Sequence, residues 1–397
     1  MNIICDIEDC TGCSACESIC PRNCIVLKEN EEGFKYPYID DKKCINCGLC
    51  KKTCPIINPP SIEMNKRKAL IVRSKNSNIL AECASGGAVT TFAEYILNKF
   101  GVVYSAVYDD DLNVCHIRID KKEDLKRISG SKYVQSDITG VFKNVKQDVK
   151  DGKIVMFCGT PCQAAGLSNF LGDFRSNVII VDLVCHGVPS PLLWRKYLEY
   201  CNGKKHKIIK ANFRSKHFGY HMASMECKFD DGIKIFASAR TNMMLKCFFK
   251  NVADRYSCYN CKFKTIDRCS DLTVYDCWHA EELSSEIVDD DKGYTNVILQ
   301  SEKGVQLLKN CSELLEIYDT SLDEAINVDG SMATNSVKMP ETRKDFYKKI
   351  NEMGLENTVF EYFPISFLDY CIEMIKEILV KLKLSSMINK LFKKFKK

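Results

Sequence analysis

The stretch that decides the fold runs from Cys10 to Pro55, where one cysteine pattern is written twice. Residues 10–21 read CTGCSACESICP and residues 44–55 read CINCGLCKKTCP, with identical spacing between the cysteines. Two residues between successive thiolates let the backbone wrap around one face of an iron–sulfur cube. Three sulfurs then reach three irons, and the fourth ligand comes from elsewhere in the chain. The doubled pattern predicts two 4Fe-4S clusters.

The two runs resemble those of the bacterial two-cluster ferredoxins, in which the fourth cysteine of each run crosses to the other cluster. The resemblance implies that one cluster takes Cys10, Cys13, Cys16 and Cys54, and that the other takes Cys44, Cys47, Cys50 and Cys20. Structural zinc is the competing interpretation, but a zinc site needs only four ligands and no proline after them. Eight cysteines in two tandem runs therefore favour iron–sulfur clusters.

Length and composition restrict the class of protein. A chain of 397 residues is too long for a ferredoxin alone, so we expect further domains. The amino terminus shows no basic start followed by an apolar run, which predicts a cytoplasmic protein without a secretory signal. In a reducing cytoplasm the 24 cysteines are expected as metal ligands and free thiols rather than disulfides. The formal charge of +5 counts the cluster thiolates as neutral, so it gives no support to nucleic-acid binding.

The remaining pattern predicts an α+β ferredoxin-like domain followed by an α/β domain with a mixed sheet. Between the cysteine runs, the alternation over residues 24–40 predicts a hairpin. The chain after residue 62 alternates expected strands (68–73, 102–108, 114–119, 154–158 and 178–184) with expected helices (86–100, 139–150, 161–170 and 191–200). This alternation is typical of parallel strands. Residues 208–238, with an Asp231-Gly232 turn, predict an antiparallel portion.

Four cysteines outside the doubled run predict a third cluster. Cys162 begins an expected helix and Cys185 closes the next expected strand, so both should reach the carboxyl edge of the sheet. A helix amino end also favours a thiolate. Cys258 and Cys261 form a pair with two-residue spacing in a polar loop, a spacing typical of metal ligands.

Other cysteines offer alternatives. The residues that could replace one of the four ligands are Cys158, Cys269 and Cys277. A buried free cysteine often serves as a small apolar residue, and we expect that role for Cys5, Cys24, Cys83, Cys201, Cys227, Cys311 and Cys371.

Two loops are candidates for binding an anion. Ala84-Ser85-Gly86-Gly87 precedes an expected helix, where glycines let unpaired amides face a phosphate, although a simple helix cap explains the same residues. Gly130-Ser131-Lys132-Tyr133 places a cation and an aromatic ring in a loop, which suits an anionic ligand or an ordinary surface turn. Neither a Gly-x-Gly-x-x-Gly fingerprint nor a Walker loop occurs, so a Rossmann nucleotide site is not indicated.

Several of these motifs together resemble the coenzyme F-420 hydrogenase/dehydrogenase beta-subunit family. They are Ser85-Gly86-Gly87, residues 130–136 (GSKYVQS), residues 159–163 (GTPCQ), residues 185–191 (CHGVPSP), Asn212-Phe213-Arg214 and residues 257–261 (SCYNC). The resemblance implies a flavin adenine dinucleotide (FAD) and an additional 4Fe-4S cluster. The family includes deazaflavin-reducing hydrogenase subunits, formate dehydrogenase subunits, hydroxymethyl chlorophyll a reductases and bacterial members linked with polysaccharide pyruvyl transferases.

This chain departs from the family pattern at two places. Residues 275–279 read YDCWH where the family usually has Gly-Asp-x-Trp-Gly, and Tyr220 follows Phe218-Gly219 where a tryptophan is common. Both departures concern the substrate pocket. The domains we expect are a ferredoxin domain (1–62), two parts of the family domain (63–150 and 151–310), a connecting region (311–363) and a basic amphipathic helix (364–397).

A flavin is also expected on chemical grounds. Clusters pass single electrons, whereas an organic substrate usually takes a hydride or an electron pair, so a two-electron cofactor must stand between them. We expect the flavin near Ser85, Gly86, Gly87 and Lys132. His186 and Lys132 are the candidate catalytic residues, and a hydrogen bond to a cluster sulfur is the structural alternative for His186.

The expected function is that of an iron–sulfur flavoprotein oxidoreductase. Its substrate would be a small molecule, either a deazaflavin like coenzyme F-420 or another organic acceptor, including one from polysaccharide biosynthesis. Electrons would be exchanged with a redox partner protein or a small electron carrier. The alternative is an electron-transfer subunit that has no substrate site of its own.

The last segment adds one further expectation. Residues after Pro364 predict a long helix with an apolar stripe, and the segment beyond Glu377 holds seven lysines and no acidic residue. A basic amphipathic helix can lie on an anionic membrane surface, although such segments are also found solvated or packed on a partner. Peripheral membrane contact through this helix is one expected interaction.

Overall fold

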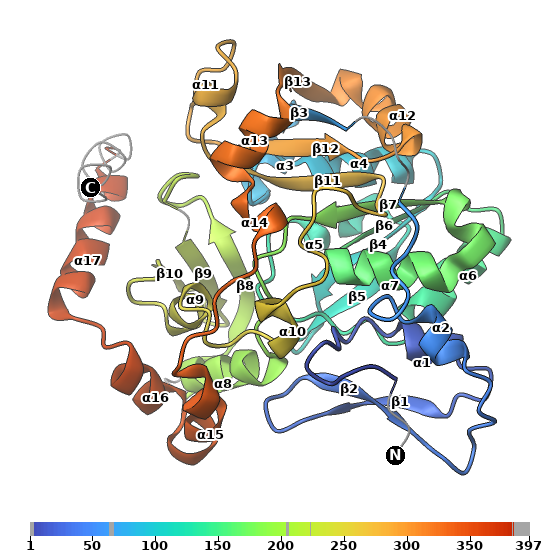
Figure 1. Ribbon diagram of the computed structural model, residues 1–397. Helices are drawn as coiled ribbons and strands as arrows, with labels where there is room; N and C mark the ends of the chain where they lie inside the picture. The colour runs from blue at the N-terminus through green and yellow to red at the C-terminus, as the bar shows by residue number, and fades with distance from the viewer. Residues whose placement is uncertain (1–3, 63–66, 204–205, 223, 383, 385–397) are drawn as a thin grey trace.

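The computed structural model describes residues 4–62, 67–203, 206–222, 224–382 and 384, and its first part repeats the cysteine pattern as structure (Figure 1). Helices α1 (Ala15–Ile19) and α2 (Leu49–Thr53) occupy equivalent positions in the two cysteine runs. Their N-caps, Ser14 and Gly48, both adopt the left-handed conformation, with φ of 65° and 74°. Strands β1 (Ile25–Glu29) and β2 (Lys35–Ile39) pair antiparallel, so the predicted hairpin is confirmed.

A mixed eight-stranded sheet forms the centre of the rest. Its order is β13-β3-β12-β11-β7-β6-β4-β5. The strands are β3 (Lys68–Ser74), β4 (Val102–Tyr108), β5 (Val114–Ile119), β6 (Val155–Gly159), β7 (Val178–Leu183), β11 (Leu272–Cys277), β12 (Tyr294–Leu299) and β13 (Leu315–Thr320). Only β11, β7, β6 and β4 pair parallel, and antiparallel strands extend the sheet on both sides. The mixed sheet was predicted, whereas its antiparallel flanks were not placed.

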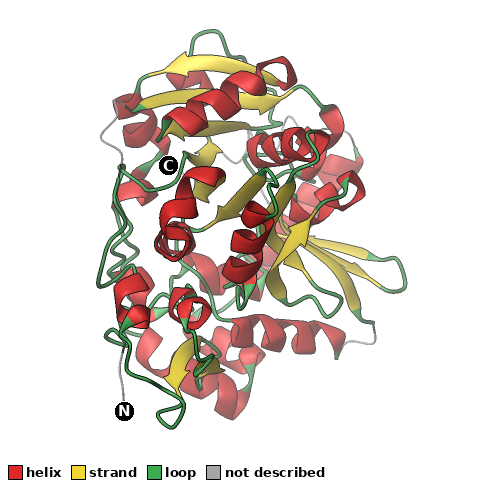
Figure 2. Cartoon of the chain, turned by 90° about the vertical axis from the view of Figure 1, so that its right-hand side faces the viewer, coloured by secondary structure: helices red, strands yellow, loops and turns green. Residues whose placement is uncertain are grey.

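Helices cover both faces of this sheet (Figure 2). Because side chains alternate along a strand, Val103 and Val107 of β4 pack with α4 (Ala88–Asn98), while Val102 and Tyr104 pack with α6 (Val141–Lys150) and α7 (Pro161–Leu171). The two apolar layers bring the carboxyl ends of β6 and β7 to one edge, as the sequence predicts for Cys162 and Cys185.

A second, three-stranded antiparallel sheet lies beside the first. It has the order β10-β9-β8, with β8 (Ile208–Ser215), β9 (Ser224–Phe229) and β10 (Lys234–Ala237), and the predicted Asp231-Gly232 turn joins β9 to β10. The remaining helices are α3 (Ser77–Glu82), α5 (Leu125–Ile128), α8 (Pro191–Asn202), α9 (Met243–Phe249), α10 (Tyr256–Tyr259), α11 (Ala280–Leu283), α12 (Glu302–Asn310), α13 (Leu322–Asp329), α14 (Ser331–Thr334), α15 (Arg343–Met353), α16 (Leu355–Tyr362) and α17 (Phe367–Lys381). Short 3₁₀ turns occur at Lys122–Asp124, Gly172–Asn177 and Ser312–Leu314.

The ferredoxin-like part is clamped to the larger part at its hairpin. Arg343 of α15 is fully buried, and its guanidinium donates two hydrogen bonds, of 2.8 and 2.6 Å, to the Glu32 carboxylate. Phe34 enters the same apolar cluster as Leu193 and Trp194 of α8. A bidentate pair of this kind fixes orientation as well as distance. The two parts therefore behave as one packed body.

The long helix predicted after Pro364 is confirmed over α17, and the rest of that prediction, from residue 385 onward, lies outside the described residues. In Figure 1, α17 lies apart from the eight-stranded sheet, on the side of β10. No helix within the described ranges combines the length and the apolar character needed to span a bilayer.

Candidate functional site

The four thiols predicted for one ferredoxin cluster surround a single small cavity. Cys10, Cys13, Cys16 and Cys54 all line a space of about 20 Å³. Backbone amides of Gly12, Ala15 and Glu17 form hydrogen bonds with the sulfurs of Cys10, Cys13 and Cys16 respectively. Amide hydrogen bonds to sulfur stabilise the charge of a thiolate-bound cluster. Buried sulfur ligands supported by amides fit a 4Fe-4S cluster.

The second group of thiols is more exposed. Burial raises the pKa of Cys50, and the nearby thiols of Cys47 and Cys20 raise it further. Cys20, the predicted crossing ligand, therefore lies beside the second run. Cys44 packs in the same apolar cluster as Cys20. This set also fits a cluster, at the more solvent-accessible end of the ferredoxin-like part, where Cys47 is exposed.

Two further cysteines touch these groups. The sulfur of Cys24 lies 3.3 Å from that of Cys20, and Cys5 forms hydrogen bonds with Cys10 and Cys54. The sequence predicts both only as small apolar residues of the core. The structure places each one against a predicted ligand, since Cys5 shortly precedes the first run and Cys24 follows Cys20 by four residues.

The four cysteines predicted for a third cluster converge. Burial and, after it, the nearby thiol of Cys261 raise the pKa of Cys162 to about 11. Burial likewise raises the pKa of Cys185 to about 12, and there Cys162 is the next cause. The pKa of Cys258 is raised by burial and then by Asp254, Cys185 and Cys261. Three segments that lie 23 to 99 residues apart in sequence thus bring four thiols together. Four thiols are the donor set that a 4Fe-4S cluster requires.

The three alternative ligands lie among other groups. Cys158 interacts with Ser105, Cys269 lies near Asp182, and Cys277 lies near Asp329. The groups that shift the pKa values of these three alternative cysteines include none of the four converging thiols. The geometry therefore favours Cys162, Cys185, Cys258 and Cys261 over these substitutes.

Helix α7 connects the third group to the first. Cys162 begins this helix, and Gly166 follows one turn later on the same face. A side chain at Gly166 would place its Cβ 2.8 Å from the sulfur of Cys13, so only glycine permits this approach. Cys162 in turn contributes to the raised pKa of Cys13. The two thiol groups are therefore close neighbours across the interface.

Arg255 lies at the same interface, three residues before Cys258. Its side chain is fully buried and donates to the carbonyl oxygens of Cys10 and Lys35 and to Oε1 of Gln135. One of its terminal nitrogens lies 3.8 Å from the sulfur of Cys10. Among the described residues no carboxylate lies within ion-pair distance of it, and a buried cation normally requires a counter-charge. An anionic cluster held by Cys10 would supply one.

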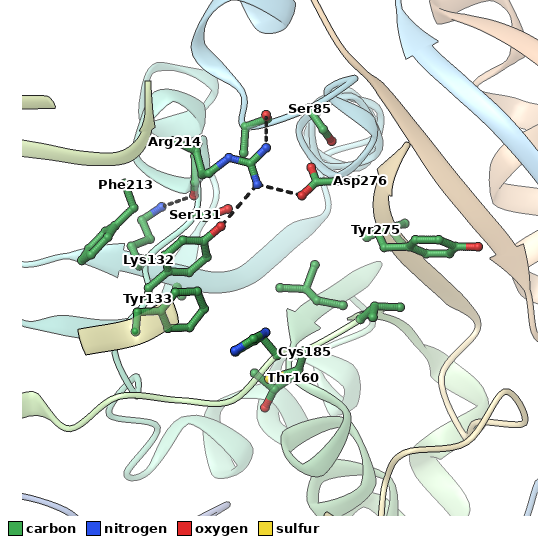
Figure 3. A pocket seen from close by; sticks show the side chains of 18 of the residues that line it. Ser85, Ser131, Lys132, Tyr133, Thr160, Cys185, Phe213, Arg214, Tyr275 and Asp276 are labelled. Atoms are coloured by element: carbon green, nitrogen blue, oxygen red, sulfur yellow. Dashed lines mark hydrogen bonds and ion pairs between the residues drawn. The ribbon is translucent and has the colours of Figure 1, made fainter. Parts of the chain in front are cut away.

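A cavity of about 910 Å³ opens beside the third group, and both Cys162 and Cys185 are in its wall. The predicted residues Ser85, Gly87, Lys132 and His186 also line it, and Gly86 does not. Figure 3 shows Ser85 and Lys132 in this wall. Ligand cavities usually range from about 300 to 1,000 Å³, so the space is large enough for a dinucleotide. Other wall residues come from β4, β8, β11, α9, α13 and α17.

The N-terminus of α4 opens into this cavity. Gly87 is its N-cap, in the left-handed conformation with φ of 82°, and no side chain caps the first turn. Ala88, Val89 and Thr90, the first three residues of the helix, line the cavity. Uncapped amides and the positive end of the helix dipole favour an anion there. This fits the phosphates of FAD.

The other two residues of that motif serve the loop itself. The hydroxyl of Ser85 lies 2.8 Å from that of Thr295, and the amide of Gly86 donates to the Thr295 hydroxyl. A Cβ at Gly86 would come within 2.6 Å of the carbonyl oxygen of Val72. Lys216 donates to the carbonyl oxygen of Ser85 at 2.7 Å, which fixes the loop further.

Lys132 and His186 occupy different parts of the wall. The ammonium of Lys132 donates to the carbonyls of Arg127, Ser129 and Gly130, and burial lowers its pKa to about 8. The Nε2 of His186 lies 2.7 Å from Oδ1 of Asn251, and burial lowers the pKa of the imidazole, so the ring is neutral at pH 7.

Arg214 contacts residues from several of the motifs, although the sequence predicted no role for it. Its guanidinium donates to Asp276 at 2.7 Å and to the hydroxyl of Tyr133 at 3.3 Å, as Figure 3 shows. It also lies 4.5 Å from the ring centre of Trp278. Tyr220 stacks on Trp278 at 4.5 Å. One of the departures from the family pattern, Tyr220, therefore packs against Trp278, which matches that pattern, and Arg214 lies beside both rings.

Comparison with known proteins follows the same division of the chain. The matching family is described as "Coenzyme F420 hydrogenase/dehydrogenase, beta subunit", with its amino-terminal part at residues 69–143 and its carboxy-terminal part at residues 152–324. Residues 9–56 match the "4Fe-4S dicluster domain". The last match covers both cysteine runs.

The curated relatives include a "Coenzyme F420-dependent sulfite reductase" of Methanocaldococcus jannaschii, 23% identical over 80% of this chain and 48% of that protein. One of the subunits of the F(420)H(2) dehydrogenase of Methanosarcina mazei is 22% identical over 44% of this chain and 53% of its own length. The chain thus spans about half the length of these relatives. A ferredoxin of M. jannaschii is 33% identical over 17% of this chain and 96% of its own length.

Among solved structures, a chain from "Xenon derivatization of the F420-reducing [NiFe] hydrogenase complex from Methanosarcina barkeri" aligns with a TM-score of 0.46 and 16% identity. The alignment covers 72% of this chain and 91% of that chain.

Proposed function

Because the chain belongs to the coenzyme F420 hydrogenase/dehydrogenase beta-subunit family and carries a 4Fe-4S dicluster domain, we propose that it is an iron–sulfur flavoprotein oxidoreductase. When bound, the clusters carry single electrons and FAD exchanges an electron pair or hydride with an organic substrate. Coenzyme F420 is the first substrate to test, since two relatives carry it in their names. Another organic or sugar-linked acceptor is the second class.

One observation carries the proposal. Cys162 and Cys185, from the group of four converging thiols, are in the wall of the cavity that also receives the open N-terminus of α4. On its other side Cys162 lies one helical turn from Gly166, against which Cys13 packs. The ferredoxin-type thiols around Cys13, the third group of thiols and the dinucleotide-sized cavity are thus neighbours in that order.

Separate residues would hold each group. The twelve cysteines predicted from the sequence would ligate three clusters. The first turn of α4 would bind the FAD phosphates, and the ammonium of Lys132, which donates to three carbonyl oxygens, would attract them through its charge. Lys216 fixes the loop before α4 through the carbonyl oxygen of Ser85. Arg214, held by Asp276 and stacked on Trp278, shapes the wall opposite Cys185.

His186 is better suited to orienting than to donating protons. Its Nε2 is engaged with Asn251, its ring centre lies 4.8 Å from that of Phe248, and its pKa is lowered by burial. A neutral ring fixed on two sides retains one free nitrogen, which serves a hydrogen bond within the cavity. Lys132 stays the stronger candidate for contact with cofactor or substrate, because it is a partly buried cation at the cavity wall.

Iron and sulfide analysis of the anaerobically prepared full chain tests the cluster count. We expect about 12 iron atoms per chain, and about 8 after Cys258→Ala with Cys261→Ala, because one of three four-iron clusters is lost. Cys269→Ala is the matched control, since Cys269 is a partly buried thiol, as the four ligands are, but lies outside the convergent group. About 8 iron atoms in the native chain, or an equal loss in the control, would contradict the third site.

Flavin and substrate are tested separately. Acid release should yield FAD from the native chain, and reduced protein should be reoxidised by coenzyme F420 or by another organic acceptor. An electron-transfer subunit without a substrate site would keep its clusters but show no acceptor-dependent flavin reoxidation. The size of the cavity favours the enzyme over this alternative.

A further inference from the structure

Helix α17 is amphipathic, but its polar side faces the protein and its apolar side faces outward, the opposite of an ordinary surface helix. Its polar side chains face the protein: Glu377 lies 2.9 Å from His217, Glu373 accepts from the amide and the hydroxyl of Ser238, and Lys376 is buried against Glu373 at 2.8 Å. A capping box between Ser366 and Asp369 begins the helix. These contacts fix the rotation of the helix about its axis.

The apolar side chains consequently face outward. At least 40% of the surface of each of the following residues is exposed: Phe367, Leu368, Tyr370, Met374, Ile375, Ile378, Leu382 and Leu384. Six of these residues lie in α17 at spacings that place them on one side of the helix, and Leu382 and Leu384 follow just beyond its end. Single exposed apolar residues are ordinary, but a continuous stripe marks an interaction surface. We name these eight residues the α17 stripe.

The sequence that continues from α17 indicates what covers the stripe. Residues 381–397 contain seven lysines and no acidic residue. Between the lysines, Met387, Ile388, Leu391, Phe392 and Phe395 supply further apolar side chains. An apolar stripe followed by a dense group of lysines matches the two components of an anionic bilayer surface, its acyl boundary and its negative headgroups.

We propose that the α17 stripe docks this protein on the surface of an anionic membrane, with α17 lying in the plane of the interface and the lysines that follow in the sequence attracting the headgroups. The polar side of α17 stays on the protein, so docking requires no rearrangement of the contacts at Ser238 and His217. Asp369 and Lys376 of the same helix also line the large cavity. Docking therefore brings that cavity next to the lipid surface.

Vesicle sedimentation with the full chain tests this proposal. We expect the chain to pellet with vesicles of phosphatidylcholine and phosphatidylglycerol, and to stay in solution with phosphatidylcholine alone. Sodium chloride at about 0.5 M should reduce binding, since screening weakens the attraction of lysines to headgroups. Iron content and thermal denaturation of each variant confirm that the fold is unchanged.

Two variants separate the components. Ile375→Gln with Ile378→Gln should weaken binding by about tenfold or more, because two exposed apolar side chains can no longer enter the acyl boundary. Lys393→Gln with Lys394→Gln should weaken it by about tenfold through lost charge. The matched control is Phe100→Gln with Ile154→Gln, which removes two apolar side chains that are 91% and 44% exposed. They precede β4 and β6, at the edge of the sheet opposite the cavity.

Three results would overturn the proposal. Equal binding to neutral and anionic vesicles would remove the role of the lysines, and equal loss in the control with Phe100 and Ile154 replaced would remove the role of the α17 stripe. A native chain that ignores both vesicles and elutes as a dimer, which Ile375→Gln with Ile378→Gln converts to a monomer, would assign the stripe to a second copy. None of these results bears on the clusters or the flavin, so the proposed oxidoreductase function is tested separately.

Discussion

Replacing Arg255 with glutamine should lower the reduction potential of the cluster held by Cys10, by on the order of 100 mV. Arg255 is a fully buried cation, and its guanidinium lies 3.8 Å from the sulfur of Cys10. Reduction adds a negative charge to that cluster. A nearby positive charge favours the reduced form, so its removal makes the potential more negative.

The magnitude follows from Coulomb attraction. If the guanidinium lies about 7 Å from the centre of the added charge, an effective dielectric constant of about 20 gives about 2.4 kcal/mol. For a one-electron couple, about 1.4 kcal/mol corresponds to about 59 mV, so the expected shift is about 100 mV. Water entering the interface would reduce it.

The control is Arg255→Lys, which separates charge from hydrogen bonding. Both variants lose the fork that joins Cys10, Lys35 and Gln135, so both should lower the melting temperature. Only glutamine removes the charge. In a redox titration followed by electron paramagnetic resonance, Arg255→Gln should shift one ferredoxin cluster and Arg255→Lys should shift it by less than half as much.

The reasoning would be refuted by equal shifts in the two variants, since the potential would then follow the damaged interface. An unchanged potential in Arg255→Gln would show that the charge of this arginine is screened from the cluster.

Two further predictions concern the interface and the cavity. Gly166→Ala should destabilise the protein by about 1–3 kcal/mol although alanine favours helices, because its Cβ would meet the sulfur of Cys13 at 2.8 Å. Thermal denaturation measures this, and Gly203→Ala, where the nearest atom is 3.5 Å away, should not destabilise. Burial lowers the pKa of Lys132 to about 8, so its ammonium loses its proton as pH rises through that value and FAD retention should weaken above about pH 8. Lys132→Arg should retain FAD there, and fluorescence of released flavin distinguishes the two profiles.

The sequence predicts best where periodicity is strong and local. The strand expected over residues 102–108 is β4, and the helix expected over residues 161–170 ends one residue later, at Leu171. These segments succeed because alternation and helix caps act within a few residues. Cys162 and Cys185 could be placed at one sheet edge because parallel strands share their carboxyl ends.

Long-range pairing could not be predicted in the same way. β3 lies between β12 and β13, strands that follow it by more than two hundred residues, and no local pattern reveals such a partner. The burial of Arg255 could not be predicted from the sequence either. An arginine in a polar segment is usually exposed, and only the neighbouring Cys258 could have suggested otherwise.

The rotation of α17 illustrates the same limit in a different way. Its apolar stripe was visible in the sequence, and an amphipathic helix normally buries that stripe in its own protein. Which side faces inward depends on what the rest of the fold offers. Here Ser238 follows directly after β10 and His217 lies in the loop before β9, and their hydrogen-bonding groups pair with Glu373 and Glu377. Since burying a polar group without a partner is costly, the polar side is drawn inward and the apolar side is left for another surface.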